Sequence, residues 1–268
     1  MSIVAIIPAR YASSRFPGKP LCDILGKPMI QHVYERAARA HVDRVLVATD
    51  DERIASAVRA FGGEALMTSA AHRSGTDRLA EAVQSVHAEV VINVQGDEPL
   101  IEPAHIDAAI APLRAEPTVE MTTLAAPLRD VDEFLSPNVV KVVCDARGNA
   151  LYFSRSPIPS VRGGSSERAR TTIERGLAWR HIGLYAYRRA TLLRLASLPP
   201  ATLEEAEALE QLRALANGIA VRVVPVSATA GMAVDTPQDL ERVRALMART
   251  ATDVAHLKGA TCPPNTSS

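Results

Sequence analysis

The sequence is poor in cysteine, balanced in charge and free of long apolar runs. Cys22, Cys144 and Cys262 are scattered and form no C-x-x-C pair. They therefore indicate neither a disulfide framework nor a structural zinc site, and they favour a reducing compartment such as the cytoplasm. Thirty Lys and Arg balance thirty Asp and Glu, so no overall field would attract nucleic acid or an anionic membrane. Any basic binding site must be local.

Membrane segments and the common nucleotide motifs are missing as well. No segment approaches the roughly eighteen apolar residues of a transmembrane helix, and the N-terminal apolar run is too short for a signal peptide. We therefore expect a soluble protein with neither a membrane nor a nucleic-acid partner. The patterns G-x-x-x-x-G-K-[ST] and G-x-G-x-x-G do not occur, which argues against a P-loop NTPase and against the usual dinucleotide-binding dehydrogenases.

Strand-like and helix-like segments alternate along the first part of the chain. Apolar runs of strand length occupy 3–7, 44–50, 64–68 and 90–94, and helical spacing occupies 28–38, 51–61 and 76–86. This alternation predicts an α/β fold of three layers, α/β/α, with a mostly parallel central sheet. The 268 residues are 47% hydrophobic, which is enough for a sizeable core.

The pattern changes after residue 119. Strand-like runs at 121–128, 139–145 and 150–153 follow one another with little helix between them, which predicts an antiparallel or mixed extension of the sheet. Residues 160–176 are rich in Gly, Ser and Arg and read as a surface loop. Strands at 181–187 and 219–226 and helices at 203–216 and 238–247 complete a single domain, 1–249, and the tail 250–268 is expected to be disordered.

A basic loop follows the first strand-like run. Residues 3–7 end at Pro8, as in a strand buried on both faces of a parallel sheet. The loop that follows carries cationic and hydroxyl side chains, namely Arg10, Ser13, Ser14, Arg15 and Lys19. Such groups at the end of a buried strand can hold a polyphosphate. A solvated basic loop is the alternative that this stretch alone leaves open.

Two aspartates stand at the ends of apolar stretches. Asp97 follows the run 90–94, and ligands bind at the carboxyl ends of strands in open α/β sheets. There Asp97 can hold Mg²⁺, which prefers oxygen ligands and substrate phosphates; a turn or N-cap role is the alternative. Asp235 precedes the helix start at Thr236 and Pro237, and taken alone it reads as an N-cap.

Polar groups elsewhere suit a nucleotide base and a sugar acid. Backbone around Gly75, between Ser74 and Arg78, can approach a pyrimidine edge because no side chain intervenes; an ordinary capped loop is the alternative. Arg155 suits bidentate carboxylate binding, although a surface arginine would look the same. With His181, Tyr185, Glu210 and Gln211 it makes a set suited to a carboxylate-bearing sugar with many hydroxyls.

These stretches together resemble one family. The loop Arg10-x-x-Ser13-x-Arg15-x-Pro17-Gly18-Lys19-Pro20-Leu21 is similar to the signature of the nucleotidyltransferases that activate sugars, with Phe16 where leucine is usual. The stretches S-G-T-x-R (74–78), Y-F-S-R (152–155), R-H-x-G-x-Y (180–185), L-E-Q-L-R (209–213) and V-D-T-P (234–237) resemble the CMP-Kdo synthetases, the 3-deoxy-manno-octulosonate cytidylyltransferases.

The resemblance implies an activity and a site. The activity is Mg²⁺-dependent transfer of CMP from CTP to the anomeric hydroxyl of Kdo (3-deoxy-D-manno-octulosonate), with release of pyrophosphate, in cytoplasmic lipopolysaccharide biosynthesis. A homodimer would form through section 119–190. The implied catalytic residues are Lys19, Arg15, Asp97 and Asp235, of which Asp97 and Asp235 bind metal. CTP would contact Arg10, Ser13, Arg15, Lys19, Ser74, Gly75, Arg78 and Gln95, and the sugar would contact Gln95, Arg155, His181, Tyr185, Glu210 and Gln211.

Two alternatives remain at this stage. One is another sugar nucleotidyltransferase, such as a CMP-sialic acid synthetase or a hexose-1-phosphate enzyme. The other, from a different class, is a nucleotide-sensing module without catalysis, which the complete set of basic and acidic residues disfavours.

Overall fold

The computed structural model describes residues 1–12, 16–72, 74–162, 165–227 and 232–259. Its strands, in chain order, are β1 (Ile3–Ala9), β2 (Asp23–Ile24), β3 (Lys27–Pro28), β4 (Arg44–Thr49), β5 (Ala65–Met67), β6 (Val90–Asn93), β7 (Met121–Pro127), β8 (Lys141–Cys144), β9 (Ala150–Ser154), β10 (Trp179–Arg188) and β11 (Val221–Pro225).

The helices are α1 (Met29–Ala37), α2 (Glu52–Ala60), α3 (Gly75–Ala82), α4 (Pro103–Ala115), α5 (Val131–Leu135), α6 (Ser165–Glu174), α7 (Arg189–Ser197), α8 (Thr202–Glu207), α9 (Leu212–Ala216) and α10 (Pro237–Gly259), with 3₁₀ turns η1 (Lys19–Leu21) and η2 (Val83–Ser85). Within the described residues, no helix combines the length and the apolar character needed to cross a membrane.

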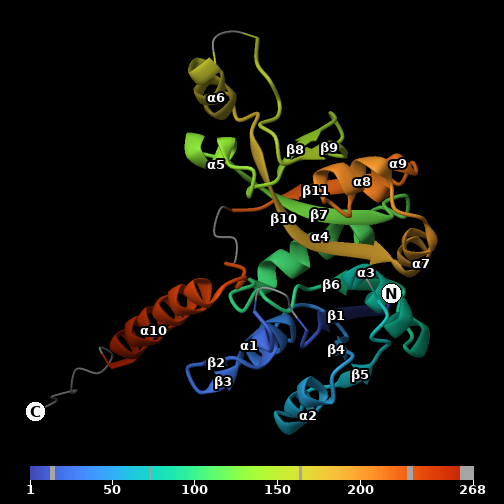
Figure 1. The fold of residues 1–268 in the computed structure, drawn as a ribbon, viewed down its shortest axis with the longest axis vertical. Helices are drawn as coiled ribbons and strands as arrows, with labels where there is room; N and C mark the ends of the chain where they lie inside the picture. The colour runs from blue at the N-terminus through green and yellow to red at the C-terminus, as the bar shows by residue number, and fades with distance from the viewer. Residues whose placement is uncertain (13–15, 73, 163–164, 228–231, 260–268) are drawn as a thin grey trace, which may run out of the picture.

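One mixed sheet organises the chain. Its order is β11-β7-β10-β6-β1-β4-β5, with β1 parallel to both β4 and β6, and β4 parallel to β5. Strand β10 enters antiparallel between β6 and β7, and β11 runs parallel to β7. The hairpin β8–β9 pairs with the start of β10 and projects with α5 and α6 from one end of the molecule (Figure 1). The predicted parallel sheet with a mixed extension is confirmed.

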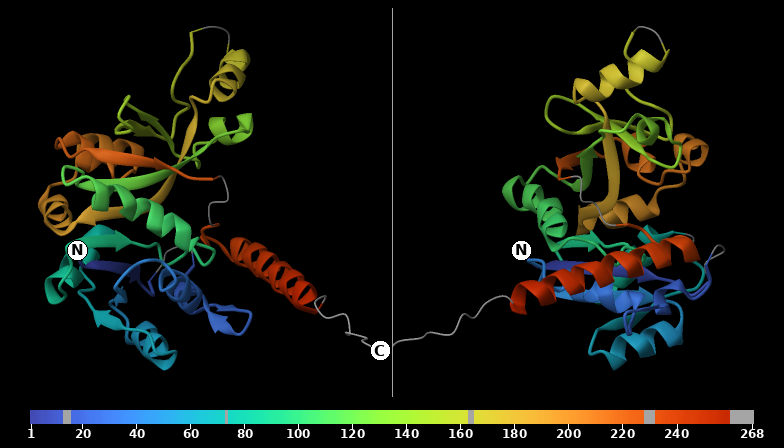
Figure 2. Two further views of the ribbon diagram at one scale, coloured as in Figure 1. Left: turned by 180° about the vertical axis from the view of Figure 1, so that it is seen from behind. Right: turned by 90° about the vertical axis from the view of Figure 1, so that its left-hand side faces the viewer.

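Helices cover both faces of the sheet, as the alternating side chains of β1 require. Ile3, Ala5 and Ile7 pack in one buried cluster with residues of α1, α2 and α4. Val4 and Ile6 point to the other face and pack with residues of α3, α7 and α9. The two sets of helices lie on opposite sides of the strands (Figure 2), so the expected three layers are present.

The carboxyl ends of β1 and β6 meet at one edge of the sheet, because the two strands are parallel and in register. At that edge the backbone of Gly96 lies so close to β1 that a Cβ atom there would come within 2.8 Å of the carbonyl oxygen of Pro8. The approach leaves room for no side chain between the two segments. It sets the spacing between the basic loop after β1 and the turn after β6.

Helix α10 returns the end of the chain to the same edge. Leu240 and Val243 pack with Ile24 and Met29, and the guanidinium of Arg244 donates from Nε to the carbonyl oxygen of Asp23 at 2.9 Å. Just before the helix, the N–H of Val234 donates to the carbonyl oxygen of Asp97 at 2.8 Å. These contacts carry residue 235 to the edge where β6 ends.

Three local expectations are wrong. The helix expected at 203–216 is two helices, α8 and α9, separated by Ala208 with φ 51°. The surface loop expected at 160–176 contains α6, whose Ala169 and Ile173 pack against Phe134 of α5. The part of the expected disordered tail from residue 250 to Gly259 is helical, and residues 260–268 lie outside the described residues. Helices α4, α5 and α7 were not predicted at all.

A glycine swap tests the close approach at the sheet edge. Gly96→Ala places a methyl group against the Pro8 carbonyl, and the overpacking should lower the free energy of unfolding by about 1–3 kcal/mol. Gly183→Ala is the matched control, because a Cβ there meets no atom within 4 Å. Urea unfolding of both variants measures the difference, and equal stabilities would show that the approach is not constrained.

Candidate functional site

A cavity of about 290 Å³ opens at the edge where β1 and β6 end. Its wall combines the loop after β1, the start of α3, the turn after β6 and the segment before α10. The lining residues are Pro8, Ala9, Arg10, Lys19, Pro20, His72, Ser74, Gly75, Arg78, Gln95, Gly96, Asp97 and Asp235. Small-molecule sites usually start near this volume, and they combine a preformed cavity with a few convergent polar groups.

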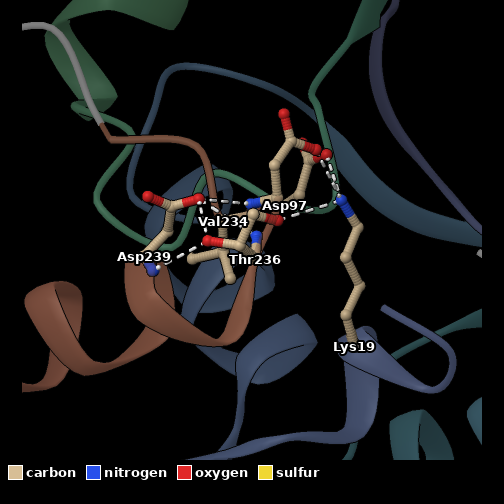
Figure 3. A network of polar contacts seen from close by, with 6 residues as sticks. Lys19, Asp97, Val234, Thr236 and Asp239 are labelled. Atoms are coloured by element: carbon tan, nitrogen blue, oxygen red, sulfur yellow. Dashed lines mark hydrogen bonds and ion pairs between the residues drawn. The ribbon is translucent and has the colours of Figure 1, made fainter. Parts of the chain in front are cut away.

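The ammonium of Lys19 lies among oxygen atoms from the middle and the end of the chain (Figure 3). Its Nζ donates to Oδ2 of Asp97 at 2.7 Å and to the carbonyl oxygen of Val234 at 3.0 Å. Oδ1 of Asp235 is 3.5 Å from the same nitrogen. The Lys19 side chain is 15% exposed, against 27% for Asp97 and 41% for Asp235. Partial burial strengthens these charge contacts relative to the open surface.

Local structure holds each member of this cluster. Lys19 begins η1 directly after Gly18, whose φ of 73° favours glycine. Asp97 follows β6 in a turn, so its carboxylate is free of any helix cap and faces Lys19. Asp239 accepts from the N–H of Thr236 at 3.0 Å, and the hydroxyl of Thr236 accepts from the N–H of Asp239 at 3.2 Å. Thr236 therefore caps α10, and Asp235 is not the N-cap that its position alone indicated.

The segment 74–78 meets the cavity at the N-terminus of α3. The hydroxyl of Ser74 accepts from the N–H of Asp77 at 3.2 Å, and the carboxylate of Asp77 accepts from the N–H of Ser74 at 3.3 Å, which closes a capping box. Arg78 is 4% exposed. Its guanidinium donates to Oγ1 of Thr68 at 2.5 Å and to Asp50 at 3.1 Å. These two contacts fix the direction of Arg78 at the cavity wall.

A second, much smaller cavity of about 20 Å³ lies beside α9, lined by Thr76, Met121, Tyr185, Tyr187, Leu195, Glu210 and Gln211. Among the described residues, Oε1 of Glu210 and Nε2 of Gln211 are buried without a hydrogen-bond partner. Burial also raises the pKa of Glu210 above its ordinary value. Buried polar atoms of this kind are rare in folded proteins and favour a polar ligand or water at this place.

His181 lies next to this second cavity on β10. Its Nε2 is 2.9 Å from Oγ1 of Thr123, and its ring contacts Tyr185 with centroids 5.5 Å apart. The ring of Phe153 packs edge-on against the same imidazole, with centroids 4.9 Å apart. Burial among these groups lowers the pKa of His181 to about 3, so the imidazole is neutral at physiological pH.

Arg155 lies apart from both cavities. Its guanidinium donates to the carbonyl oxygens of Glu207 at 2.8 Å, Pro137 at 3.1 Å and Ala208 at 3.4 Å. The Glu207 carboxylate in turn accepts from the hydroxyl of Ser154 at 2.6 Å and from the N–H of Arg155 at 2.9 Å. The chain turns at Ala208, with φ 51°, directly after α8, so Glu207 lies on a different element from Glu210 and Gln211.

The structure therefore brings together most of the nucleotide set but divides the sugar set. The main cavity contains eight of the expected residues: Arg10, Lys19, Ser74, Gly75, Arg78, Gln95, Asp97 and Asp235. Of the sugar set it contains only Gln95, whose Nε2 donates to the carbonyl oxygen of Gly183 at 3.3 Å. Ser13 and Arg15 lie outside the described residues. The roles of all these residues stay predictions.

Sequence reasoning missed several residues at the site. His72 lines the cavity and its ring contacts the carboxylate of Glu81, a pairing with no signal in the sequence. The Val234 carbonyl was also missed, since main-chain atoms leave no mark in a pattern of residue types. The Thr236–Asp239 capping box did carry a signal, because the spacing T-x-x-D before an apolar run is its signature.

Comparison with known proteins adds a family and several relatives. A family model described as cytidylyltransferase matches residues 4–223. A 3-deoxy-manno-octulosonate cytidylyltransferase of Geobacter sulfurreducens is 59% identical over 246 residues, which are 91% of this chain and 98% of that protein. One from Syntrophotalea carbinolica is 58% identical over 247 residues, with 91% and 98% covered.

Solved structures that resemble this chain include enzymes with related names. A CMP:2-keto-3-deoxy-manno-octonic acid synthetase in complex with CTP superposes with a TM-score of 0.86 at 49% identity, covering 93% of this chain and 100% of that one. A 4-diphosphocytidyl-2C-methyl-D-erythritol synthase from Anaerococcus prevotii shares the fold at 15% identity, with a TM-score of 0.58 and coverage of 92% and 96%.

Acidification tests the environment of His181. Because its folded pKa of about 3 is below the unfolded value of about 6.5, only the unfolded state takes up this proton between those values. Stability is therefore lost as pH falls below about 6.5, by about 2 kcal/mol at pH 5. His181→Gln removes this loss, so the variant should lose less stability than wild type between pH 7 and pH 5 in urea unfolding.

The control for that measurement is His87→Gln, which replaces an exposed histidine and should keep the pH dependence of wild type. If His181→Gln lost as much stability on acidification as wild type, the imidazole would not be held neutral by burial.

Proposed function

The chain belongs to the cytidylyltransferase family, and on that premise we propose that it transfers CMP from CTP to the anomeric hydroxyl of Kdo, giving CMP-Kdo and pyrophosphate. The observation that carries the proposal is the convergence of Lys19, Asp97 and Asp235 at one wall of a cavity whose other walls hold Arg10, Ser74 and Arg78. The cavity thus combines cationic side chains suited to a triphosphate with carboxylates suited to a metal ion. It also has a wall at Gly75 that a base can approach.

For this reaction the protein must align the two substrates and neutralise the negative charge on the leaving pyrophosphate. The anomeric hydroxyl attacks the α-phosphorus in line, the bond to the β-phosphate oxygen breaks, and pyrophosphate leaves. Arg10 and Lys19 bind the triphosphate and stabilise the charge that grows on the leaving group. Ser74, Gly75 and Arg78 face the base and ribose from α3. We assign no side chain as general base.

A divalent cation fits beside Asp97 and Asp235. Two carboxylates and the Val234 carbonyl already surround a positive charge there, the ammonium of Lys19. No group of three or more His, Cys, Asp or Glu side chains suited to a metal occurs among the described residues. Mg²⁺ typically uses one or two protein carboxylates, such as those of Asp97 and Asp235, and completes its shell with phosphate oxygens and water. When bound, Mg²⁺ supplies Lewis-acid neutralisation of the phosphates.

The sugar acid is assigned to the side of the cavity nearest β10. Gln95 borders the main cavity, and Tyr185, Glu210 and Gln211 line the small one beside it. Unpaired buried atoms of Glu210 and Gln211 can serve the hydroxyls of a sugar, and neutral His181 orders the ring of Tyr185. Arg155 would reach the sugar carboxylate only by leaving its three carbonyl partners.

A homodimer through section 119–190 is part of the proposal. That section projects from the sheet as α5, α6 and the hairpin β8–β9 (Figure 2), and it exposes Leu135, Leu151 and Leu177. We assign these exposed leucines to the dimer contact, and a monomer in sedimentation equilibrium would contradict the homodimer. We place the reaction in the cytoplasm, because the three cysteines are scattered and form no C-x-x-C pair, and thiols stay reduced in that compartment.

An assay of pyrophosphate release tests the activity. CTP with Kdo and Mg²⁺ should give rapid release, and UTP or ATP with Kdo, or CTP with sialic acid, should give little. Preference for sialic acid or for a hexose 1-phosphate would move the chain to another nucleotidyltransferase activity. No release with any pair would support a nucleotide-sensing module.

Replacement of Asp97 tests the metal site. Asp97→Asn keeps the shape of the side chain but removes one of the charges around the cation, so kcat at saturating Mg²⁺ should fall about a hundredfold or more. Asp107→Asn is the control, since this carboxylate lies outside the cavity lining and contacts the backbone N–H and the ring of the surface residue His41. Near-normal turnover of Asp97→Asn at high Mg²⁺ would refute the metal role.

Replacement of Lys19 tests whether its ammonium competes with the metal. Without nucleotide, Lys19→Met should bind Mn²⁺ at least about fivefold more tightly than wild type, because a positive charge next to Asp97 is gone. The same variant should bind CTP more weakly. Titration calorimetry measures both, with Lys27→Met, whose partner is Glu35, as the control. Weaker Mn²⁺ binding by Lys19→Met would contradict a shared cation position.

A further inference from the structure

We propose that Arg53, which does not line the cavity, is a positioning residue for the basic loop and acts through the ring of Tyr11. The inference rests on the proposed function, since it assigns Arg53 to the binding of CTP. It concerns the neck of the loop, defined as Tyr11 and Gly18, where the chain leaves the sheet edge and comes back to it.

A main-chain hydrogen bond closes the neck. The N–H of Gly18 donates to the carbonyl oxygen of Tyr11 at 2.9 Å. Each neck residue is the immediate neighbour of a cavity residue, because Arg10 precedes Tyr11 and Lys19 follows Gly18. A change in the neck therefore moves two cations of the phosphate site at once.

The ring of Tyr11 packs against Gly18, the other residue of the neck. A Cβ atom on Gly18 would come within 3.0 Å of Cζ and of Oη of Tyr11. Glycine is needed here for two reasons, the positive φ of 73° and the phenol end of this ring. The neck can keep its geometry only while the ring stays in place.

Arg53 holds the ring from helix α2. Its Cζ lies 3.3 Å from the centroid of the Tyr11 ring, which is a cation–π contact. Asp51 fixes the guanidinium, accepting from Nε at 2.9 Å and from Nη2 at 2.6 Å. Asp51 also caps α2 by accepting from the N–H of Arg53 at 2.9 Å. The ring is thereby tied to a helix that is packed on the sheet through Ile54 and Val58.

The arrangement predicts a specific kinetic effect. The Arg53 side chain is 60% exposed, so its replacement leaves the core intact. Loss of the contact frees the ring, loosens the neck and misplaces Arg10 and Lys19, which serve the nucleotide. The residues assigned to the sugar lie in the turn after β6, on β10 and around α9, and they are untouched. Arg53 should therefore affect CTP binding and leave sugar binding alone.

The test compares binding and kinetics in a set of variants of the full chain. Arg53→Gln should raise the dissociation constant for Mg·CTP in calorimetry, and KM for CTP, about two- to fivefold, with KM for Kdo unchanged. Arg53→Lys, which keeps a cation, should recover part of the loss. Tyr11→Leu should resemble Arg53→Gln, and the double variant should be little worse than either single one, because both break the same contact.

Arg59→Gln is the matched control. It removes another exposed arginine from the same helix, one that pairs with Glu52, and it should bind CTP as wild type does. Equal rises in KM for CTP and Kdo, unchanged CTP binding by Arg53→Gln, or additive effects in the double variant would overturn the positioning role. Failure of wild type itself to bind CTP would instead overturn the proposed function.

Discussion

The meeting of one ammonium with two carboxylates is the constraint on which the site depends. Lys19 and Asp235 are 216 positions apart in the chain, and Asp97 lies between them in sequence. Charges that are partly buried in this way must be compensated by one another or by ligands. Three local structures bring these charges together: the η1 turn after Gly18 positions Lys19, the turn after β6 positions Asp97, and the capped start of α10 positions Asp235.

The sheet explains how such distant residues meet. Parallel strands β1 and β6 deliver the basic loop and Asp97 to one edge, and α10 closes that edge through its packing on Ile24 and Met29. Antiparallel β10, inserted between β6 and β7, places Tyr185 opposite Asn93 of β6 and supplies Tyr185 and Tyr187 to the lining of the small cavity. The proposed nucleotide and sugar sides thus lie on the two sides of a change in strand direction.

Much of this architecture could be predicted from sequence, and the failures share a cause. The strands β1, β4 and β6 and the helices α1, α2 and α3 show clear apolar periods, and they were found. Helix α6 has a weak apolar period and is stabilised by its contacts with α5. The helix break at Ala208 has no glycine or proline in the sequence that would predict it. Arg155 shows the same limit, because its carbonyl partners at 137, 207 and 208 come from segments brought to it by folding.

By itself, the sequence determined the alternation of strands and helices, the family of the chain and the set of residues proposed to hold a magnesium nucleotide. These follow from local spacing, since hydrophobic periods and loop motifs act over a few neighbouring residues. Only the tertiary structure decided that Lys19 lies between Asp97 and Asp235, that Arg53 covers the ring of Tyr11 and that Arg155 faces carbonyl groups. Such contacts join residues whose separation along the chain carries no information about their distance in space.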